Sequence, residues 1–134
     1  MAPPFFTGIY AALLAGFFIY LSARTIQSRR SARVVIGTQG DETLLRRSRA
    51  HANFAEYVPL TLILMALAEG NGAAWWIINP IGLVLLAGRA IHAYGVSQTN
   101  ETLSYRVRGM VMTFAALGTA AAVSIIVAVL GLFS

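Results

Sequence analysis

The chain has 134 residues, of which 57% are hydrophobic and only 11% are charged, with a formal net charge of +5. A soluble domain is usually about one quarter charged, so this composition excludes an ordinary soluble protein and predicts a small integral membrane protein, with one domain over residues 1–134. The absence of cysteine excludes disulfides, thiolate metal sites and a cysteine nucleophile. All ten basic side chains are arginines, and in so apolar a chain their expected partners are membrane lipids or a small anion, with no nucleic acid.

The first predicted element is a membrane span. Residues 1–23 carry no charged side chain, and Phe5 to Ser22 approaches the roughly 20 apolar residues that cross a bilayer. We expect this helix to continue for one or two turns, to Arg24 or Ser28. No basic segment precedes the apolar run, so we expect a retained span rather than a cleaved signal peptide.

A basic segment follows the first span. Residues 24–49 hold seven arginines against two acids, and their glycines mark a loop. Because arginine-rich loops stay in the cytoplasm, this segment predicts that both termini lie on the non-cytoplasmic side. Asp41 can cap a second helix, expected from about Glu42 to Ala68, in which Pro59 is tolerable within a membrane bundle.

The third span is predicted after a short turn at residues 69–72. It runs from about Ala73 to Ala93, with Trp75 and Trp76 placed where interfacial tryptophans gather in membranes. The turn contains no basic residue, as expected on the side opposite the arginine-rich loop. A second polar loop, from Gly95 to Ser104, follows the span.

The fourth span starts near Arg106 and Arg108. No charged residue occurs from Gly109 to Ser134. Small side chains on this span predict close packing of helices in lipid; they are Gly109, Ala115, Ala116, Gly118, Ala120, Ala121 and Ala122. The fold class predicted from these four spans is all-α, an integral membrane four-helix bundle.

Polar residues from all four predicted spans meet at one level of this bundle. Arg49, Asn53 and Glu56 share one helix face, because they stand at i, i+4 and i+7. The ends of the other spans bring further members to this level: Arg29, Arg30, Arg89, His92, Arg106 and Arg108. Arginine binds carboxylates and Glu56 can bind an ammonium group, so the cluster predicts a pocket for a small anion with an amine.

Two segments of the chain resemble those of a known family. The first is Arg49-Ala50-His51-Ala52-Asn53-Phe54-Ala55-Glu56-Tyr57-Val58-Pro59-Leu60, and the second is Arg106-Val107-Arg108-Gly109-Met110-Val111-Met112-Thr113. Both are similar to segments of the MAPEG family, the membrane-associated proteins in eicosanoid and glutathione metabolism. The likeness covers nearly the whole chain and is greatest to the bacterial branch.

The resemblance implies a homotrimer with sites between neighbouring subunits and glutathione as cosubstrate. It implies that either Arg106 or Arg108 stabilises the glutathione thiolate, and the pattern R-x-x-G-x-x-x-T favours Arg106. One position differs from the family, because Val96 stands where a tyrosine is expected. The residues that the resemblance assigns to glutathione binding are Arg29, Arg49, Asn53, Glu56, Tyr57 and His92.

These expectations combine into a function. We expect a glutathione-dependent transferase or peroxidase in a bacterial inner membrane, in which an arginine-stabilised thiolate attacks hydrophobic electrophiles. No metal is expected, because two isolated histidines do not make a metal site. Two alternatives stay open: a small proton-coupled efflux protein that uses Glu56, and a lipid-binding family member without catalysis.

Overall fold

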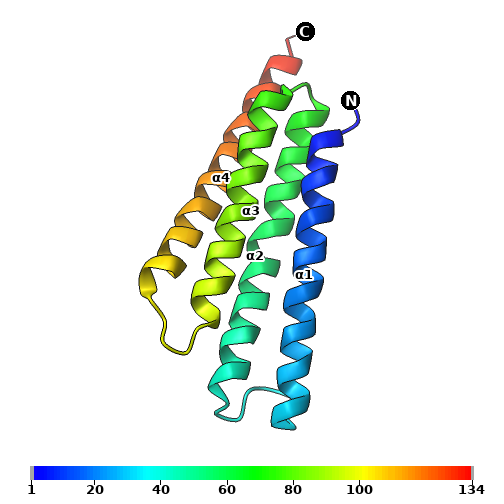
Figure 1. Ribbon diagram of the computed structural model, residues 1–134. Coiled ribbons are helices and arrows are strands. Elements are labelled where there is room, and N and C mark those ends of the chain that lie inside the picture. Colours follow the sequence, from blue (N-terminus) through cyan, green and yellow to red (C-terminus); the bar gives the residue numbers. More distant parts are fainter. Residues whose placement is uncertain (1, 134) are drawn as a thin grey trace.

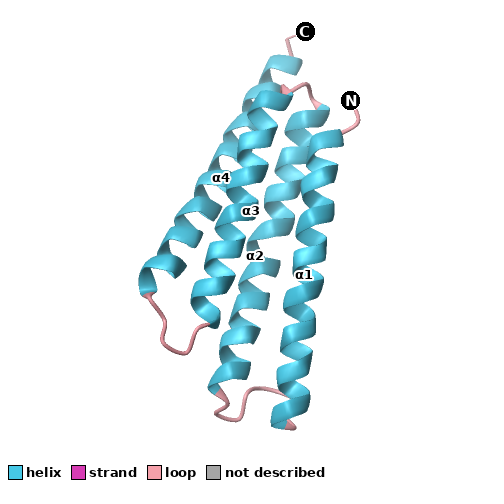
Figure 2. Cartoon of the chain, in the orientation of Figure 1, coloured by secondary structure: helices cyan, strands magenta, loops and turns pink. Residues whose placement is uncertain are grey.

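The computed structural model describes residues 2–133 as four long helices that alternate in direction (Figure 1). These are α1 (Phe5–Ala32), α2 (Glu42–Gly70), α3 (Trp75–Ser97) and α4 (Leu103–Gly131). Short loops and the chain ends make up the rest of the described chain (Figure 2). All four helices are long and apolar enough to cross a membrane, which confirms the predicted all-α four-helix membrane bundle. Met1 and Ser134, the outermost residues of the predicted domain, lie outside the described residues.

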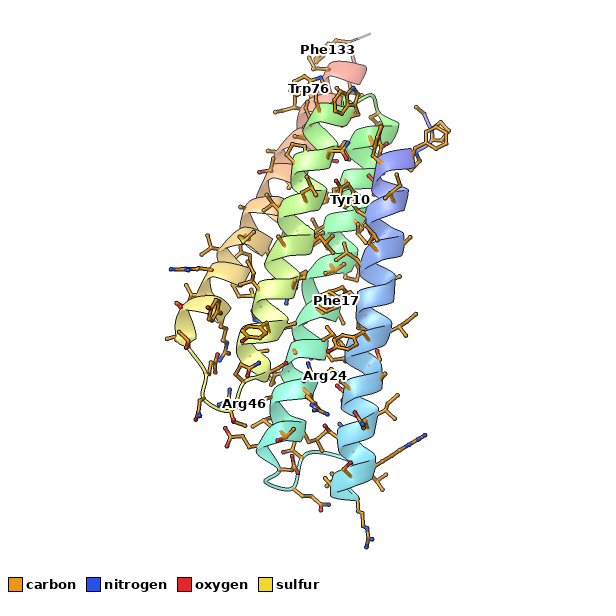
Figure 3. The ribbon with its side chains drawn as sticks, viewed as in Figure 1. Tyr10, Phe17, Arg24, Arg46, Trp76 and Phe133 are labelled. Atoms are coloured by element: carbon orange, nitrogen blue, oxygen red, sulfur yellow. The ribbon has the colours of Figure 1, made fainter. Side chains whose placement is uncertain are left out.

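The two ends of the bundle differ in composition. Both termini lie at the end that carries the α2–α3 turn, here called the terminal end (Figure 1). The α1–α2 and α3–α4 loops lie at the opposite end, here called the loop end. Trp76 lies at the terminal end, whereas Arg24 and Arg46 lie toward the loop end (Figure 3). Interfacial tryptophan and arginine are therefore separated along the bundle, as the sequence predicted.

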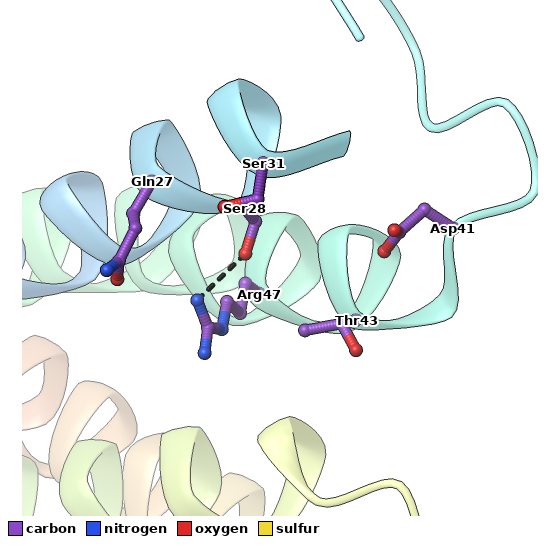
Figure 4. A pocket seen from close by; sticks show the side chains of 6 residues that line it. All are labelled: Gln27, Ser28, Ser31, Asp41, Thr43 and Arg47. Carbon is purple, nitrogen blue, oxygen red and sulfur yellow. Dashed lines mark hydrogen bonds between the residues drawn. The ribbon is translucent and has the colours of Figure 1, made fainter. Parts of the chain in front are cut away.

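α1 is longer than its hydropathy predicted, since it ends at Ala32 rather than near Arg24 or Ser28. Its polar last turns are held by α2, where Arg47 Nη1 donates a hydrogen bond of 2.8 Å to Ser28 Oγ (Figure 4). Arg33 then ends the helix in a left-handed conformation with φ 55°. Hydropathy marks only the part of a helix that suits lipid, so turns beyond it depend on contacts of this kind.

The start of α2 agrees with the prediction. The helix begins at Glu42, and Asp41 Oδ1 accepts a hydrogen bond of 2.7 Å from the backbone N–H of Leu44. This contact satisfies one of the free N–H groups of the first turn, so the predicted cap is confirmed. Three further bounds lie about a turn or less outside the predicted ones: α2 ends at Gly70, α3 ends at Ser97 and α4 begins at Leu103. α3 begins at Trp75, slightly inside the predicted start near Ala73.

The bundle is open between its first and last helices. α1 packs on α2 and α3, α4 packs on α3 and α2, and α1 and α4 make no contact within the described chain. α3 and α4 approach closely at glycines. A Cβ on Gly109 of α4 would lie 2.6 Å from the backbone nitrogen of His92 on α3. The predicted small-residue packing is thus confirmed in part. Gly109, Ala116 and Ala120 are buried, whereas Ala115, Gly118, Ala121 and Ala122 are exposed.

Candidate functional site

A group of polar side chains lies between α2, α3 and α4, in the half of the bundle nearer the loop end. α2 supplies Asn53, α3 supplies Arg89 and His92 one turn apart, and α4 supplies Thr113. We call these four residues the buried polar cluster. Arg89 and Thr113 are 0% exposed and His92 is 3% exposed. Groups so deeply buried are costly unless they are hydrogen-bonded, so their contacts decide what the cluster can do.

Arg89 is the centre of the cluster. Its Nη2 donates to Asn53 Oδ1 at 2.7 Å and to His92 Nδ1 at 2.9 Å. Its Nη1 donates to Thr113 Oγ1 at 3.1 Å, and that hydroxyl donates in turn to the carbonyl of Gly109 at 2.8 Å. One side chain therefore ties three helices together through both ends of its guanidinium group.

Two features of Arg89 are unusual for a buried cation. Its Nε is buried and has no hydrogen-bond partner. No carboxylate of residues 2–133 forms an ion pair with it. It makes a cation–π contact with Phe54, whose ring centre lies 5.9 Å from the guanidinium carbon. A cation–π contact of this kind offsets only part of the loss of water. Arg89 thus keeps a positive charge that no carboxylate of residues 2–133 pairs.

The geometry of the cluster depends on Gly109. Because this residue has no side chain, the α4 backbone lies directly against His92 on α3. One turn further along α4, Thr113 is then near enough to accept from Arg89. Close approach of two helices at small residues is typical of membrane bundles. Packing of α4 on α3 therefore accounts for the glycine and the threonine of the motif R-x-x-G-x-x-x-T, which are Gly109 and Thr113.

The three α2 residues that the sequence placed on one face, Arg49, Asn53 and Glu56, have different surroundings in the structure. Asn53 turns toward α3 and joins the buried polar cluster. Arg49 and Glu56 are exposed and form no hydrogen bond or ion pair with residues 2–133, although Glu56 acts electrostatically on Arg89. Tyr57 is half-buried, with its ring edge-on to Phe114 at 5.3 Å between centres. The two charged residues flank Asn53 on an open surface of the chain.

Arg106 and Arg108, the two candidates for the thiolate-stabilising arginine, have different surroundings. Arg106 Nη1 lies 3.7 Å from Glu101 Oε1, and Arg106 acts electrostatically on His92. Arg108 is exposed and forms no ion pair within residues 2–133. Two residues on a helix differ by about 200° in direction, so the pair cannot face the same neighbour. Within residues 2–133, Arg106 is the one of the two that faces an acid, and it stands three residues before Gly109, whose backbone packs on His92.

Arg29 is placed apart from the cluster. It lies on α1, and its Nη1 donates a hydrogen bond of 2.9 Å to the carbonyl of Gly37 in the α1–α2 loop. α1 makes no contact with α4 within the described chain. Within residues 2–133, Arg29 forms no hydrogen bond or ion pair with a residue of the buried polar cluster or with Arg106.

Several cavities lie beside α1 in the described part of the chain, and one of about 480 Å³ is lined in part by Arg29. A polar cavity of about 370 Å³ near the loop end contains Arg47 but none of the predicted site residues (Figure 4); its lining is Gln27, Ser28, Ser31, Asp41, Thr43 and Arg47. An apolar groove of about 240 Å³ between α1 and α2 is lined by Ala11, Leu14, Ala15, Phe18, Phe54, Ala55, Val58, Pro59 and Leu62. The groove shares Phe54 with the surroundings of Arg89, so an apolar surface lies next to the buried polar cluster.

Two residues of this region were given no binding or catalytic role from the sequence, although Arg89 was expected among the polar residues at this level. Arg89 is a charged side chain within an apolar span and stands three residues before His92, which is a local signal of an intrahelical contact. Glu101 accepts a hydrogen bond of 2.8 Å from Arg46 Nη1 as well as facing Arg106. Nothing near Glu101 in the chain indicates these partners, because they come from α2 and α4.

The chain is similar to known proteins over most of its length. Residues 7–127 match the MAPEG family, and this region includes the whole buried polar cluster. Inner membrane protein YecN of Escherichia coli (strain K12) is 36% identical over 111 residues, which cover 83% of each chain. The protein of the same name from Escherichia coli O6:H1 matches to the same extent.

Proposed function

Because the chain belongs to the MAPEG family, we propose that this integral membrane protein is a transferase or peroxidase that uses glutathione against lipophilic electrophiles. One observation carries the proposal. Around the buried polar cluster, Arg49, Arg89, Arg106 and Arg108 stand against Glu56 and Glu101, and Glu101 is already bound by Arg46. The region therefore has unpaired positive charge, which suits an anionic cosubstrate.

Glutathione fits the groups that this region offers. It has two carboxylates, an ammonium group, amides and a thiol. Arg49 suits a carboxylate, Glu56 suits the ammonium group, and Asn53 suits an amide. Arg106 stands one turn before Gly109, which packs on His92, and suits the thiolate. The apolar groove beside Phe54 suits a hydrophobic electrophile that arrives from the membrane.

The arginine would act through its charge. A free thiol has a pKa of about 8.5 and is mostly protonated at neutral pH, and a nearby fixed cation lowers that pKa. The sulfur then bonds to the electrophilic carbon of a chlorinated nitroaromatic, chloride leaves with the electron pair of its bond, and the thiol proton passes to water. With a hydroperoxide the sulfur attacks oxygen, an alcohol leaves, and a second glutathione completes a disulfide with release of water.

The homotrimer with sites between subunits is part of the proposal. Arg49 and Glu56 are exposed in the single chain at the depth of a membrane helix, where uncovered charges are costly. α1 and α4 are also left apart, which leaves room for a second copy between them. Arg29 would reach the site from such a copy. The arginines at the loop end favour a cytoplasmic position for that end, and the relative's name supports an inner membrane.

A glutathione titration by calorimetry in detergent tests the proposal. Wild-type protein is expected to bind, and Arg49→Ala should weaken binding by about tenfold or more, since a charged hydrogen bond is lost. Arg106→Ala should lower kcat for a chlorinated nitroaromatic by about a hundredfold, as loss of one charge-stabilising donor does elsewhere. Arg24→Ala, on α1 and over the Tyr20 ring, is the control. If wild-type protein shows no heat of binding and no conjugation, the proposal is overturned.

A lipid-binding protein without thiol chemistry is the second candidate. The groove between α1 and α2 is almost wholly apolar in its lining and suits an acyl chain. Val96 is 4% exposed and packs in the core, so no hydroxyl occupies that position. Phospholipid retained through purification, together with no glutathione binding, would favour this candidate. Dye transport in vesicles that is lost in Glu56→Gln would instead favour proton-coupled efflux.

A further inference from the structure

Besides joining three helices, Arg89 determines which atoms of its neighbours can face it. A guanidinium group has only N–H donors and no acceptor, and it stays protonated in proteins. Every atom that it contacts must therefore accept a hydrogen bond. Its Nη2 contacts one atom of the Asn53 amide, at 2.7 Å, and one ring nitrogen of His92, at 2.9 Å.

This constraint fixes the orientation of Asn53. The amide atom toward Arg89 must be Oδ1, because Nδ2 could only donate. The two hydrogens on Nδ2 then point elsewhere, and they have no partner among residues 2–133. Asn53 is only partly buried, so these donors remain accessible on the surface that carries Arg49 and Glu56.

The same constraint fixes the tautomer of His92. Its Nδ1 accepts from Arg89 and so carries no proton, which places the proton of the neutral ring on Nε2. That nitrogen forms no hydrogen bond with residues 2–133. Thr113 is fixed as well, because its hydroxyl accepts from Arg89 and donates to the carbonyl of Gly109.

We propose that Arg89 is a positioning residue that makes both Asn53 and His92 present hydrogen-bond donors to an anionic ligand that Arg89 itself does not touch. The identity of the ligand as glutathione rests on the proposed function. The assignment of donors rests only on the contacts of Arg89. Without it, Asn53 could present its oxygen and His92 its unprotonated nitrogen, and either would repel an anion.

The charge of Arg89 supports the same role. It is fully buried without a carboxylate partner in residues 2–133. An anion bound at Asn53 and His92 supplies the missing negative charge across a short, poorly hydrated distance, where electrostatic interactions are strong. Arg89 therefore adds to affinity through its charge as well as through the orientation of its neighbours.

The tautomer of His92 can be measured without any ligand. The chain has two histidines, His51 and His92, so 15N-histidine labelling of the full-length protein in detergent gives two rings, and His51→Gln assigns them. Wild type should show an unprotonated Nδ1 and a protonated Nε2 on His92. Arg89→Met, which removes every donor, should give a mixture of tautomers. A protonated Nδ1 in wild type, or an unchanged tautomer in Arg89→Met, would overturn the proposal.

Glutathione calorimetry then tests the consequence for binding. Arg89→Lys keeps the charge but loses the fork that serves both neighbours, and it should weaken binding by about tenfold. Arg89→Met should weaken it by about a hundredfold or more. Arg24→Lys should leave the affinity within about twofold, because that arginine lies on α1.

The two proposals fail in different ways. If wild type shows the predicted His92 tautomer but binds no glutathione, the proposed function fails and the positioning role stands. If wild type binds glutathione and Arg89→Lys binds it equally well with an altered tautomer, the positioning role fails. Should Arg89→Met not fold, Arg89→Lys carries both measurements, since it retains the charge and the length of the side chain.

Discussion

Glu69, in the last turn of α2, caps the first turn of α1 through Thr7. Its Oε2 accepts from the backbone N–H of Thr7 at 2.8 Å and from the Thr7 hydroxyl at 2.7 Å. Its Oε1 accepts from the backbone N–H of Phe6 at 2.8 Å. The first N–H groups of a helix have no partner within it, and the helix dipole favours a negative charge there. A buried carboxylate thus joins the two helices at the terminal end.

Loss of this cap should destabilise the protein. Glu69→Ala leaves the buried N–H group of Thr7 and the partly buried N–H group of Phe6 without acceptors, and the expected cost is about 2–3 kcal/mol of unfolding free energy. Thermal unfolding in detergent measures the effect. The control is Glu42→Ala, which removes an exposed ion pair with Arg46 and should cost at most about 1 kcal/mol. Equal effects of the two substitutions would contradict the cap.

A methyl group at Gly109 should separate α3 from α4. Its Cβ would lie 2.6 Å from the backbone nitrogen of His92, so the helices must move apart, at a cost of about 1–3 kcal/mol. Gly109→Ala should also weaken glutathione binding, because Thr113 would withdraw from Arg89. Gly118→Ala on the same helix is the matched control, since nothing lies within 4 Å of its added Cβ. Thermal unfolding and calorimetry on both variants check this, and a stable, tightly binding Gly109→Ala would refute it.

Glu101 would compete with the proposed anionic ligand for Arg106. Its Oε1 lies 3.7 Å from Arg106 Nη1, while its Oε2 is held by Arg46 at 2.8 Å. Glu101→Gln removes the negative charge beside Arg106, so the pKa of bound glutathione thiol should fall further, in proportion to the freed positive charge. The ultraviolet absorbance of the thiolate against pH measures the shift. Glu42→Gln also loses a contact with Arg46 but not one with Arg106, and it should leave the titration unchanged.

Asn53→Asp should move stability and binding in opposite directions. A carboxylate at this position would pair with Arg89 and satisfy its buried charge, which should raise the unfolding free energy by about 1–3 kcal/mol. The same change removes the amide donors and adds a negative charge, so glutathione binding should fall by about a hundredfold. Thermal unfolding and calorimetry together test this. A variant that gained both stability and affinity would contradict the role assigned to Asn53.

Much of the fold could be predicted from the sequence, because the signals are local. An apolar run long enough to cross a bilayer marks each helix, and Asp41 marks the start of α2 by its own side chain. Both depend on residues within a few positions of one another. The bounds were less accurate at Ala32, because the last turns of α1 depend on Arg47 from another helix.

The site could be predicted only in part. The spacing of Arg49, Asn53 and Glu56 placed them on one face, but it did not indicate which of them turns inward. That choice depends on Arg89, which lies 36 positions away from Asn53 along the chain.

The sequence by itself determined the number of spans, the end of the bundle at which arginine gathers and the family to which the chain belongs, since hydropathy, charge and short motifs are properties of neighbouring residues. Only the tertiary structure decided that Arg89 has no acidic partner among the described residues, that Asn53 and His92 share it, and that Glu69 reaches Thr7 across 62 positions. These contacts follow from how closely the helices pack, which in turn depends on the shapes of side chains such as Gly109 on surfaces that are distant in sequence.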